Sequence, residues 1–213
     1  MEEDNKKPEG ISWYHPASLI ATWFCIGKIP FAPGTWGSLF TLPLFAAMHY
    51  LMAFTDNASQ FVNLFMLCTL VLFIIGNWAT NIYMRKTGKH DPKEVVIDEV
   101  VGQLLVFFSA FVTIAPTLGL YNEFYGTYAS NGFDFNLATS VFLNTKPWVR
   151  YIIVSIPIYL ICFGLFRLFD IWKPWPISYC DKNIKGGFGV MFDDIFAALY
   201  ATIALYAITL LFR

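Results

Sequence analysis

Two pairs of adjacent acidic residues lie within long apolar stretches. Asp98 and Glu99 occur in VIDEVVGQLL, and Asp193 and Asp194 occur in GVMFDDIFAAL. Acids at a helix start stabilise the helix by under about 1 kcal/mol, so a purely structural role explains either pair alone. Acids in so apolar a context must face water or meet a cation, and Mg²⁺ prefers carboxylate oxygens. Four converging carboxylates would repel one another unless a divalent cation or basic residues lay among them, so the functional interpretation of the two pairs is metal binding.

A second cluster of charges closes a long apolar run in FRLFDIWKPWPI. Arg167 and Asp170 are three residues apart, so they can pair on one face of a helix. A structural ion pair near a membrane surface explains this spacing as well as a functional one does. Lys173 lies one turn further on and can point into the same cleft, while Pro174 and Pro176 fix the path by which the chain leaves.

Two glycine-bearing segments, APGTWGS and KGGFG, precede apolar runs. Glycine lets backbone N–H groups turn towards an anion, and a helix N-terminus adds partial positive charge. Thr35 or Ser38 would serve equally well as an ordinary helix cap. Carboxylates, basic side chains and such loops on one face suit phosphoryl chemistry, in which positioning and charge neutralisation dominate.

The composition indicates a membrane protein. Of 213 residues, 57% are hydrophobic, 19% aromatic and only 14% charged, and the mean hydropathy is +0.54. Soluble domains are nearer half apolar and a quarter charged. The net charge of −1 argues against a nucleic-acid partner. The four cysteines form no CxxC pair, so neither a zinc site nor a disulfide framework is expected.

The elements that must position these residues are long apolar helices. We predict an all-α, multi-helix, membrane-embedded bundle with about five such helices, in one domain spanning 16–213 after a disordered tail at 1–15. Pro43 and Pro116 predict kinks in two of the helices. The five apolar runs cover residues 36–54, 61–79, 100–121, 150–169 and 192–212.

The distribution of positive charge predicts the orientation. If the N-terminus is cytoplasmic and all five runs span, then 11 of the 14 Lys and Arg residues lie on the cytoplasmic side. The same arrangement puts all four motif-bearing segments on that side, whereas 55–60 and 122–149 form ordinary loops on the other. The sequence therefore predicts one polar site at the cytoplasmic interface.

Four segments resemble the phosphatidylglycerophosphatase A family: PFAPGTWGSL, DPKEVVIDEVVGQ, FRLFDIWKPWPI and KGGFGVMFDDIFAALYA. The resemblance covers about residues 18–212. It implies a Mg²⁺-dependent lipid phosphatase of the bacterial inner membrane, with its active site facing the cytoplasm. Such an enzyme converts phosphatidylglycerophosphate to phosphatidylglycerol and inorganic phosphate, and its fold is an all-helical bundle.

The resemblance also implies roles for individual residues. It gives three sets: metal ligands Asp98, Glu99, Asp193 and Asp194; catalytic carboxylates Asp98, Asp170, Asp193 and Asp194; and phosphate-binding residues Lys28, Gly34, Thr35, Gly37, Ser38, Arg167 and Lys173. Either a metal-bound water or one of the carboxylates would attack phosphorus. The sequence makes no prediction of the oligomeric state.

Two other functions fit the same composition. A small membrane transporter would also carry embedded acids, although its polar groups should lie near the midplane of the membrane. A membrane protein without enzymatic activity would tolerate loss of all four paired carboxylates.

Overall fold

The computed structural model describes residues 10–51, 58–117 and 147–211, and within them all regular structure is helical. The all-α prediction is confirmed. The elements are α1 (Pro16–Ala21), the 3₁₀ helix η1 (Ile26–Lys28), α2 (Pro33–Leu39), α3 (Thr41–Leu51), α4 (Ala58–Thr87), α5 (Ile97–Thr117), α8 (Pro147–Trp172), α9 (Ile177–Asn183) and α10 (Gly186–Leu211).

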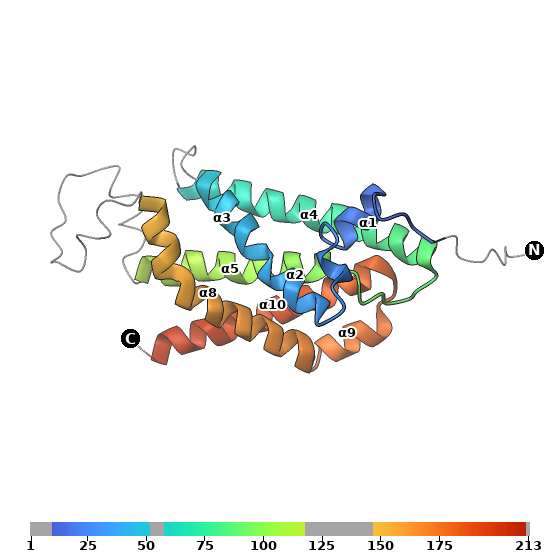
Figure 1. Ribbon diagram of the computed structural model, residues 1–213. Coiled ribbons are helices and arrows are strands. Elements are labelled where there is room, and N and C mark those ends of the chain that lie inside the picture. The colour runs from blue at the N-terminus through green and yellow to red at the C-terminus, as the bar shows by residue number, and fades with distance from the viewer. Residues whose placement is uncertain (1–9, 52–57, 118–146, 212–213) are drawn as a thin grey trace, which may run out of the picture.

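The four longest helices, α4, α5, α8 and α10, run along the long axis of the bundle, each antiparallel to the one before it in the chain (Figure 1). The closest association is between α5 and α10, and α4 and α8 each pack against both of these helices. The short helices α1, α2 and α9 lie towards one end, where α5 and α10 begin. The start of α2, the start of α5, the end of α8 and the start of α10, which are distant in sequence, therefore meet at that end.

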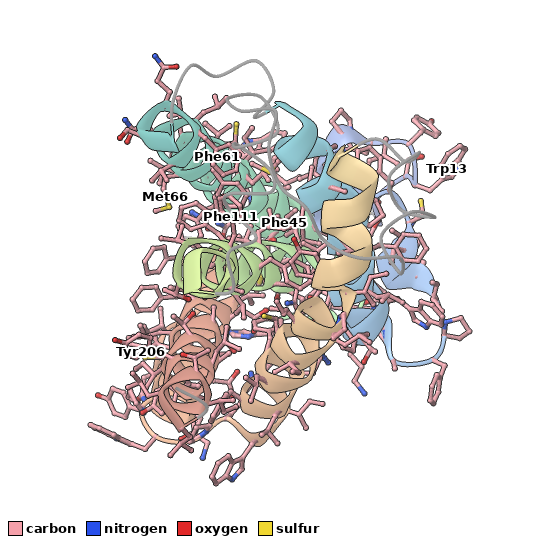
Figure 2. All side chains as sticks on the ribbon, turned by 90° about the vertical axis from the view of Figure 1, so that its left-hand side faces the viewer. Trp13, Phe45, Phe61, Met66, Phe111 and Tyr206 are labelled. Atoms are coloured by element: carbon pink, nitrogen blue, oxygen red, sulfur yellow. The ribbon has the colours of Figure 1, made fainter. Side chains whose placement is uncertain are left out.

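Aromatic side chains fill the interior away from that end. The ring centroid of Phe45 on α3 lies 5.3 Å from that of Phe107 and 5.9 Å from that of Phe65, and those of Phe61 and Phe111 are 5.4 Å apart. Figure 2 looks along the bundle and shows Phe45, Phe61 and Phe111 between the helices, whereas Met66 points outward. The Phe45–Phe65 and Phe61–Phe111 pairs are edge-to-face and the Phe45–Phe107 pair is tilted, and such pairs add specific geometry to the burial of apolar area.

The prediction of five spanning helices was too high. Among the described residues, two helical segments are long and apolar enough to cross a membrane, Ser59–Thr87 and Gly186–Leu211. The helix α5 is internal, because most of its side chains from Ile97 to Phe111 are buried by its neighbours. By contrast, α4 and α10 expose many large apolar side chains, among them Leu67, Leu70, Ile74, Ile203 and Leu211.

The first predicted run, 36–54, forms two helices instead of one kinked helix, and these are joined at Phe40. Pro43 explains the break, because it has no N–H to donate to the Leu39 carbonyl and its ring would clash with that group. As a result α2 is a separate seven-residue helix that ends beside the first turn of α3. The hydroxyl of Thr41 donates a hydrogen bond to the Gly37 carbonyl across the junction.

Both glycine-bearing segments are helical, not loops. The last helix begins at Gly186, so Asp193 and Asp194 lie in its third turn and do not open it. Gly186 has a φ of 83°, a conformation that favours glycine. Gly187 then allows α10 to approach α4, because a Cβ there would lie 2.7 Å from the Asn77 carbonyl oxygen.

Some predictions concern residues outside the described ranges. The tail predicted at 1–15 lies largely outside them, and within it the Gly10 amide donates a hydrogen bond to the Lys86 carbonyl at the end of α4. The loop predicted at 122–149 lies outside them except for its last residues, which begin α8.

Candidate active site

A cavity of about 390 Å³ opens where α5 and α10 begin and α8 ends. Its walls come from all four motif-bearing segments and from α9. The lining residues that are titratable or lie on α2 are Pro33, Gly34, Thr35, His90, Asp91, Lys93, Asp98, Glu99, Arg167, Asp170, Lys173, Asp181, Asp193 and Asp194. The predicted convergence of these segments at one end of the helices is therefore present.

Three carboxylates form the centre of this cavity. Asp98, Glu99 and Asp194 offer oxygens that all lie within 4.8 Å of one another. Asp98 and Glu99 are in the first turn of α5, as their position before an apolar run predicts. Asp194 comes from α10, which reaches α5 closely because Gly102 has no side chain; a Cβ there would lie 3.0 Å from the Asp194 carbonyl oxygen.

The donor set fits a hard divalent cation. Asp98 Oδ1 and Glu99 Oε2 are buried and have no hydrogen-bond partner among the described residues. Burial raises the pKa of the Asp98 carboxyl well above its usual range, and burial raises that of Glu99 to about 8. Unpartnered buried carboxylates are costly, and a cation such as Mg²⁺ offsets that cost by coordinating their oxygens.

Arg167 on α8 provides a positive charge beside these acids. Its guanidinium forms an ion pair with Asp170, and Nη1 lies 3.8 Å from Glu99 Oε1. The buried Nε–H has no partner among the described residues. Asp170 also interacts electrostatically with Glu99 and Asp194, so it belongs to the same charge cluster.

Lys173 lies on the opposite side of the cluster, just after α8. Its Nζ is 2.6 Å from Asp193 Oδ2 and 2.7 Å from Asp181 Oδ1. Burial disfavours the charged amine, but the hydrogen bonds to Asp181 and Asp193 outweigh burial and raise the pKa of Lys173. Asp193 is therefore engaged by a lysine, whereas among the described residues no lysine forms an ion pair with Asp98, Glu99 or Asp194.

The short helix α2 approaches the cluster through its N-terminal end. A Cβ at Gly34 would lie 2.0 Å from Glu99 Oε1 and 3.1 Å from Arg167 Nη1, so only glycine fits there. Thr35 also lines the cavity. Neither Thr35 nor Ser38 caps α2, because its N-cap is Ala32 and no side chain bonds there.

Three of the predicted phosphate-binding residues do not line the cavity: Lys28, Gly37 and Ser38. Gly37 instead packs against Val96, whose Cβ would lie 2.8 Å from an added Cβ. The Ser38 hydroxyl is fully buried and donates a hydrogen bond to the Gly34 carbonyl.

The cavity also contains residues that sequence reasoning did not single out. His90, Asp91 and Lys93 come from the DPKE segment and its preceding histidine, so their place in a motif-bearing block was an available signal. Asp181 is on α9, and nothing in its surroundings in the sequence marks it as a partner for Lys173.

Gln103, one turn beyond Glu99, is fully buried, and neither atom of its amide group has a partner among the described residues.

Comparison with known proteins places this arrangement in a family context. The model of the phosphatidylglycerophosphatase A family matches residues 19–209. The chain is 31% identical to the phosphatidylglycerophosphatase A of Haemophilus influenzae over 205 residues, which is 96% of each chain. It is 29% identical to the Escherichia coli protein of the same name, covering 91% of this chain and 84% of that one.

A Bacteroides thetaiotaomicron protein, named as a candidate phosphatidylinositol-3-phosphatase, is 32% identical and covers 87% of this chain and 88% of its own. No solved structure matches the chain significantly.

Proposed function

The chain belongs to the phosphatidylglycerophosphatase A family, and on that premise we propose that it hydrolyses the terminal phosphomonoester of phosphatidylglycerophosphate. The products are phosphatidylglycerol and inorganic phosphate. The observation that carries the proposal is the convergence, in one cavity, of the four segments that resemble the family.

The residues around the cavity divide into two groups in this proposal. Asp98, Glu99 and Asp194 would hold Mg²⁺, which is supported by their mutual distances and by the unpartnered Asp98 Oδ1 and Glu99 Oε2 among the described residues. Bound Mg²⁺ would act as a Lewis acid on a phosphoryl oxygen and lower the pKa of water. Asp193 then lies next to this set as the partner of Lys173, instead of being a fourth ligand.

Arg167 and Lys173 neutralise the phosphate of the substrate, and the backbone of Gly34 and Thr35 lies against it. The Arg167 Nε–H supports this role because it is a buried donor without a partner among the described residues. Both cations are also paired with carboxylates, which holds their side chains in place before substrate arrives. Such preorganised charge is the main contribution that a protein makes to phosphoryl transfer.

Two chemical routes fit this geometry. In one, a water attacks phosphorus and a carboxylate of the cluster accepts its proton while the glycerol oxygen leaves. In the other, a carboxylate oxygen of Asp98, Asp170, Asp193 or Asp194 forms the new O–P bond while the bond from phosphorus to the glycerol oxygen breaks and that oxygen takes up a proton. Water then cleaves the acyl phosphate, which releases inorganic phosphate and restores the carboxylate. Trapping a phosphoenzyme with hydroxylamine after rapid quenching would identify the second route and its residue.

We place the protein in the bacterial inner membrane with the cavity facing the cytoplasm. The apolar outer faces of α4 and α10 support embedding, because soluble proteins rarely expose so much contiguous apolar surface. The excess of Lys and Arg around the cavity end supports the orientation.

The decisive experiment measures phosphate release by the purified protein in detergent. The substrates are phosphatidylglycerophosphate, phosphatidic acid, phosphatidylinositol 3-phosphate and a soluble phosphomonoester, each with Mg²⁺ and with a chelator. We expect Mg²⁺-dependent turnover with the first to exceed the others. Preference for phosphatidylinositol 3-phosphate would instead support the activity in the name of the Bacteroides relative, and uptake by proteoliposomes without phosphate release would support a transporter.

Matched variants test the site. Asp98→Asn and Asp194→Asn should each reduce kcat at least about a hundredfold while the protein stays folded, because each removes a charged oxygen from the metal set. Glu94→Gln is the control, since Glu94 pairs with Lys89 outside the cavity lining. Unchanged turnover in both aspartate variants would refute the site assignment.

A further inference from the structure

A second hollow, which we call the apolar groove, lies on the bundle beyond the catalytic cavity. It is formed between the α2–α3 junction, α5 and α8, and its lining residues are Leu39, Leu42, Phe107, Ile156, Tyr159, Leu160 and Phe163. None of these side chains is charged. Phe107 and Tyr159 are buried at its base, whereas Leu39, Ile156 and Leu160 remain 40%, 41% and 61% exposed.

The groove lies on the same helices as the catalytic cavity, α2, α5 and α8, although the two hollows share no lining residue. On α8, Phe163 lies one turn before Arg167, so both project from one side of the helix. On α5, Phe107 lies eight residues after Glu99, a rise of about 12 Å. The beginning of α2 lines the cavity, and its last residue, Leu39, lines the groove.

The chemistry of the groove restricts its occupant. A specific protein partner would need roughly 20–30 residues on each side of an interface, and the groove offers seven. An acyl chain is narrow and apolar and needs no hydrogen bonds. A lipid whose terminal phosphate lies against Arg167 carries its acyl chains on the same molecule, a short distance away in the direction of the apolar part of the bundle.

We propose that the apolar groove binds an acyl chain of the lipid substrate while its phosphate occupies the catalytic cavity. This inference rests on the proposed function and extends it, because it makes the groove a determinant of the preference for lipid over soluble phosphomonoesters. The occupant is a chain of the bound substrate and not bulk bilayer lipid.

The first test narrows the groove with Leu160→Trp. The matched control is Leu199→Trp, since Leu199 on α10 is 50% exposed but lies outside the groove. The quantity measured is the ratio of kcat/KM for phosphatidylglycerophosphate with two long acyl chains to kcat/KM for its acyl-free headgroup. We expect Leu160→Trp to lower this ratio about tenfold, the loss that follows when roughly two methylene groups lose apolar contact. Leu199→Trp should leave the ratio as in the wild type.

An unchanged ratio in Leu160→Trp, or an equal fall in both variants, would overturn the inference while the proposed function stands. If the wild type releases phosphate from neither substrate, the proposed function fails and the groove assignment fails with it. The two failures are therefore distinguishable.

The second test uses the wild-type protein and does not depend on the folding of a variant. Phosphatidylglycerophosphate with a diazirine near the end of one acyl chain is irradiated with the protein, with chelator present to suspend turnover. We expect labelling within 156–163 or at Leu39 and Leu42, reduced by excess unlabelled phosphatidylglycerophosphate but not by phosphatidylcholine. Labelling spread evenly over the outer faces of α4 and α10, insensitive to either competitor, would overturn the inference.

Discussion

Lys173 connects two carboxylates with different exposure. The side chain of Asp193 is only 7% exposed, whereas that of Asp181 is 37% exposed. Removing the lysine leaves Asp193 as an uncompensated, nearly buried charge, and such losses cost far more than those of surface pairs. The same lysine therefore allows a comparison of a buried and an exposed ion pair.

We predict that Lys173→Met lowers the free energy of unfolding by about 1–3 kcal/mol, and that Asp181→Asn lowers it by less than about 1 kcal/mol. Adding Asp193→Asn to Lys173→Met should recover part of the loss, because the unpaired charge is then gone. Denaturant unfolding in detergent measures all three. Equal effects of Lys173→Met and Asp181→Asn would contradict the prediction.

The pH dependence of this contribution follows from the direction of the pKa shift. The folded-state pKa of Lys173 is raised above its ordinary value of 10.5. Its stabilisation is therefore fully present below that ordinary value and is lost only as the pH rises through the raised one. Between about pH 6 and 9 the lysine is charged in both the folded and the unfolded protein. Titration of the lysine should therefore not change the difference in unfolding free energy between wild type and Lys173→Met over this range.

Gln103 presents the opposite case, a buried polar side chain without a partner among the described residues. A buried unpaired amide costs about 1–3 kcal/mol, and an apolar side chain of similar shape does not bear that cost. We predict that Gln103→Leu and Gln103→Met unfold at the wild-type temperature or above it. A marked fall in both would show that the amide has a partner, such as an ordered water, in the folded protein.

At the scale of elements, the contact between α5 and α10 sets the spacing between Asp194 and the acids Asp98 and Glu99. Gly102 lies at this contact, and an added Cβ would meet the Phe166 ring at 2.6 Å as well as the Asp194 carbonyl oxygen. An aromatic ring and a helix backbone cannot yield as a flexible side chain would, so α10 or α8 must move. That movement would separate Asp194 from Asp98.

We predict that Gly102→Ala destabilises the protein by about 1–3 kcal/mol and lowers both Mg²⁺ affinity and turnover. Gly164→Ala is the matched control, because Gly164 lies within α8 with no atom within 4 Å of an added Cβ. There alanine should stabilise the helix by about 0.5–1 kcal/mol and leave turnover unchanged. Thermal unfolding and a Mg²⁺ titration of activity separate the two, and similar behaviour of both variants would contradict the packing argument.

At the scale of the whole molecule, a metal ion bound at the acidic cluster would couple metal binding to stability. Four helices and the α2 segment meet at the cavity, so an ion held there connects segments that are distant in the chain. A ligand that binds only the folded state stabilises it by about 2.7 kcal/mol at one hundred times its dissociation constant. Metal binding can therefore be measured through the stability of the protein, without an activity assay.

We predict that saturating Mg²⁺ raises the unfolding temperature in detergent by roughly 5–10 °C and that chelator reverses the shift. Asp98→Asn should abolish the shift, whereas Glu94→Gln should retain it. Identical unfolding temperatures of the wild type with and without Mg²⁺ would show that the cluster holds no magnesium.

The sequence alone determined the helical class, the helix start at Asp98 and Glu99, and the meeting of four motif-bearing segments. These features are local or follow from composition: acids before an apolar run predict a helix start, and long apolar runs predict helices. The glycines before Asp193 looked like a loop because local propensity disfavours glycine in helices, yet contact with α4 makes Gly187 helical.

Only the tertiary structure decided which carboxylate oxygens lie within 4.8 Å of one another, that Asp181 pairs with Lys173, that Ser38 is buried, and that an apolar groove lies on the same helices as the cavity. Among the described residues, two helical segments are long and apolar enough to cross a membrane, and apolar runs of similar composition face either neighbouring helices or the outside. The physical reason is the same in each case: contacts between distant segments depend on helix rotation and approach, which hydropathy along one chain does not specify.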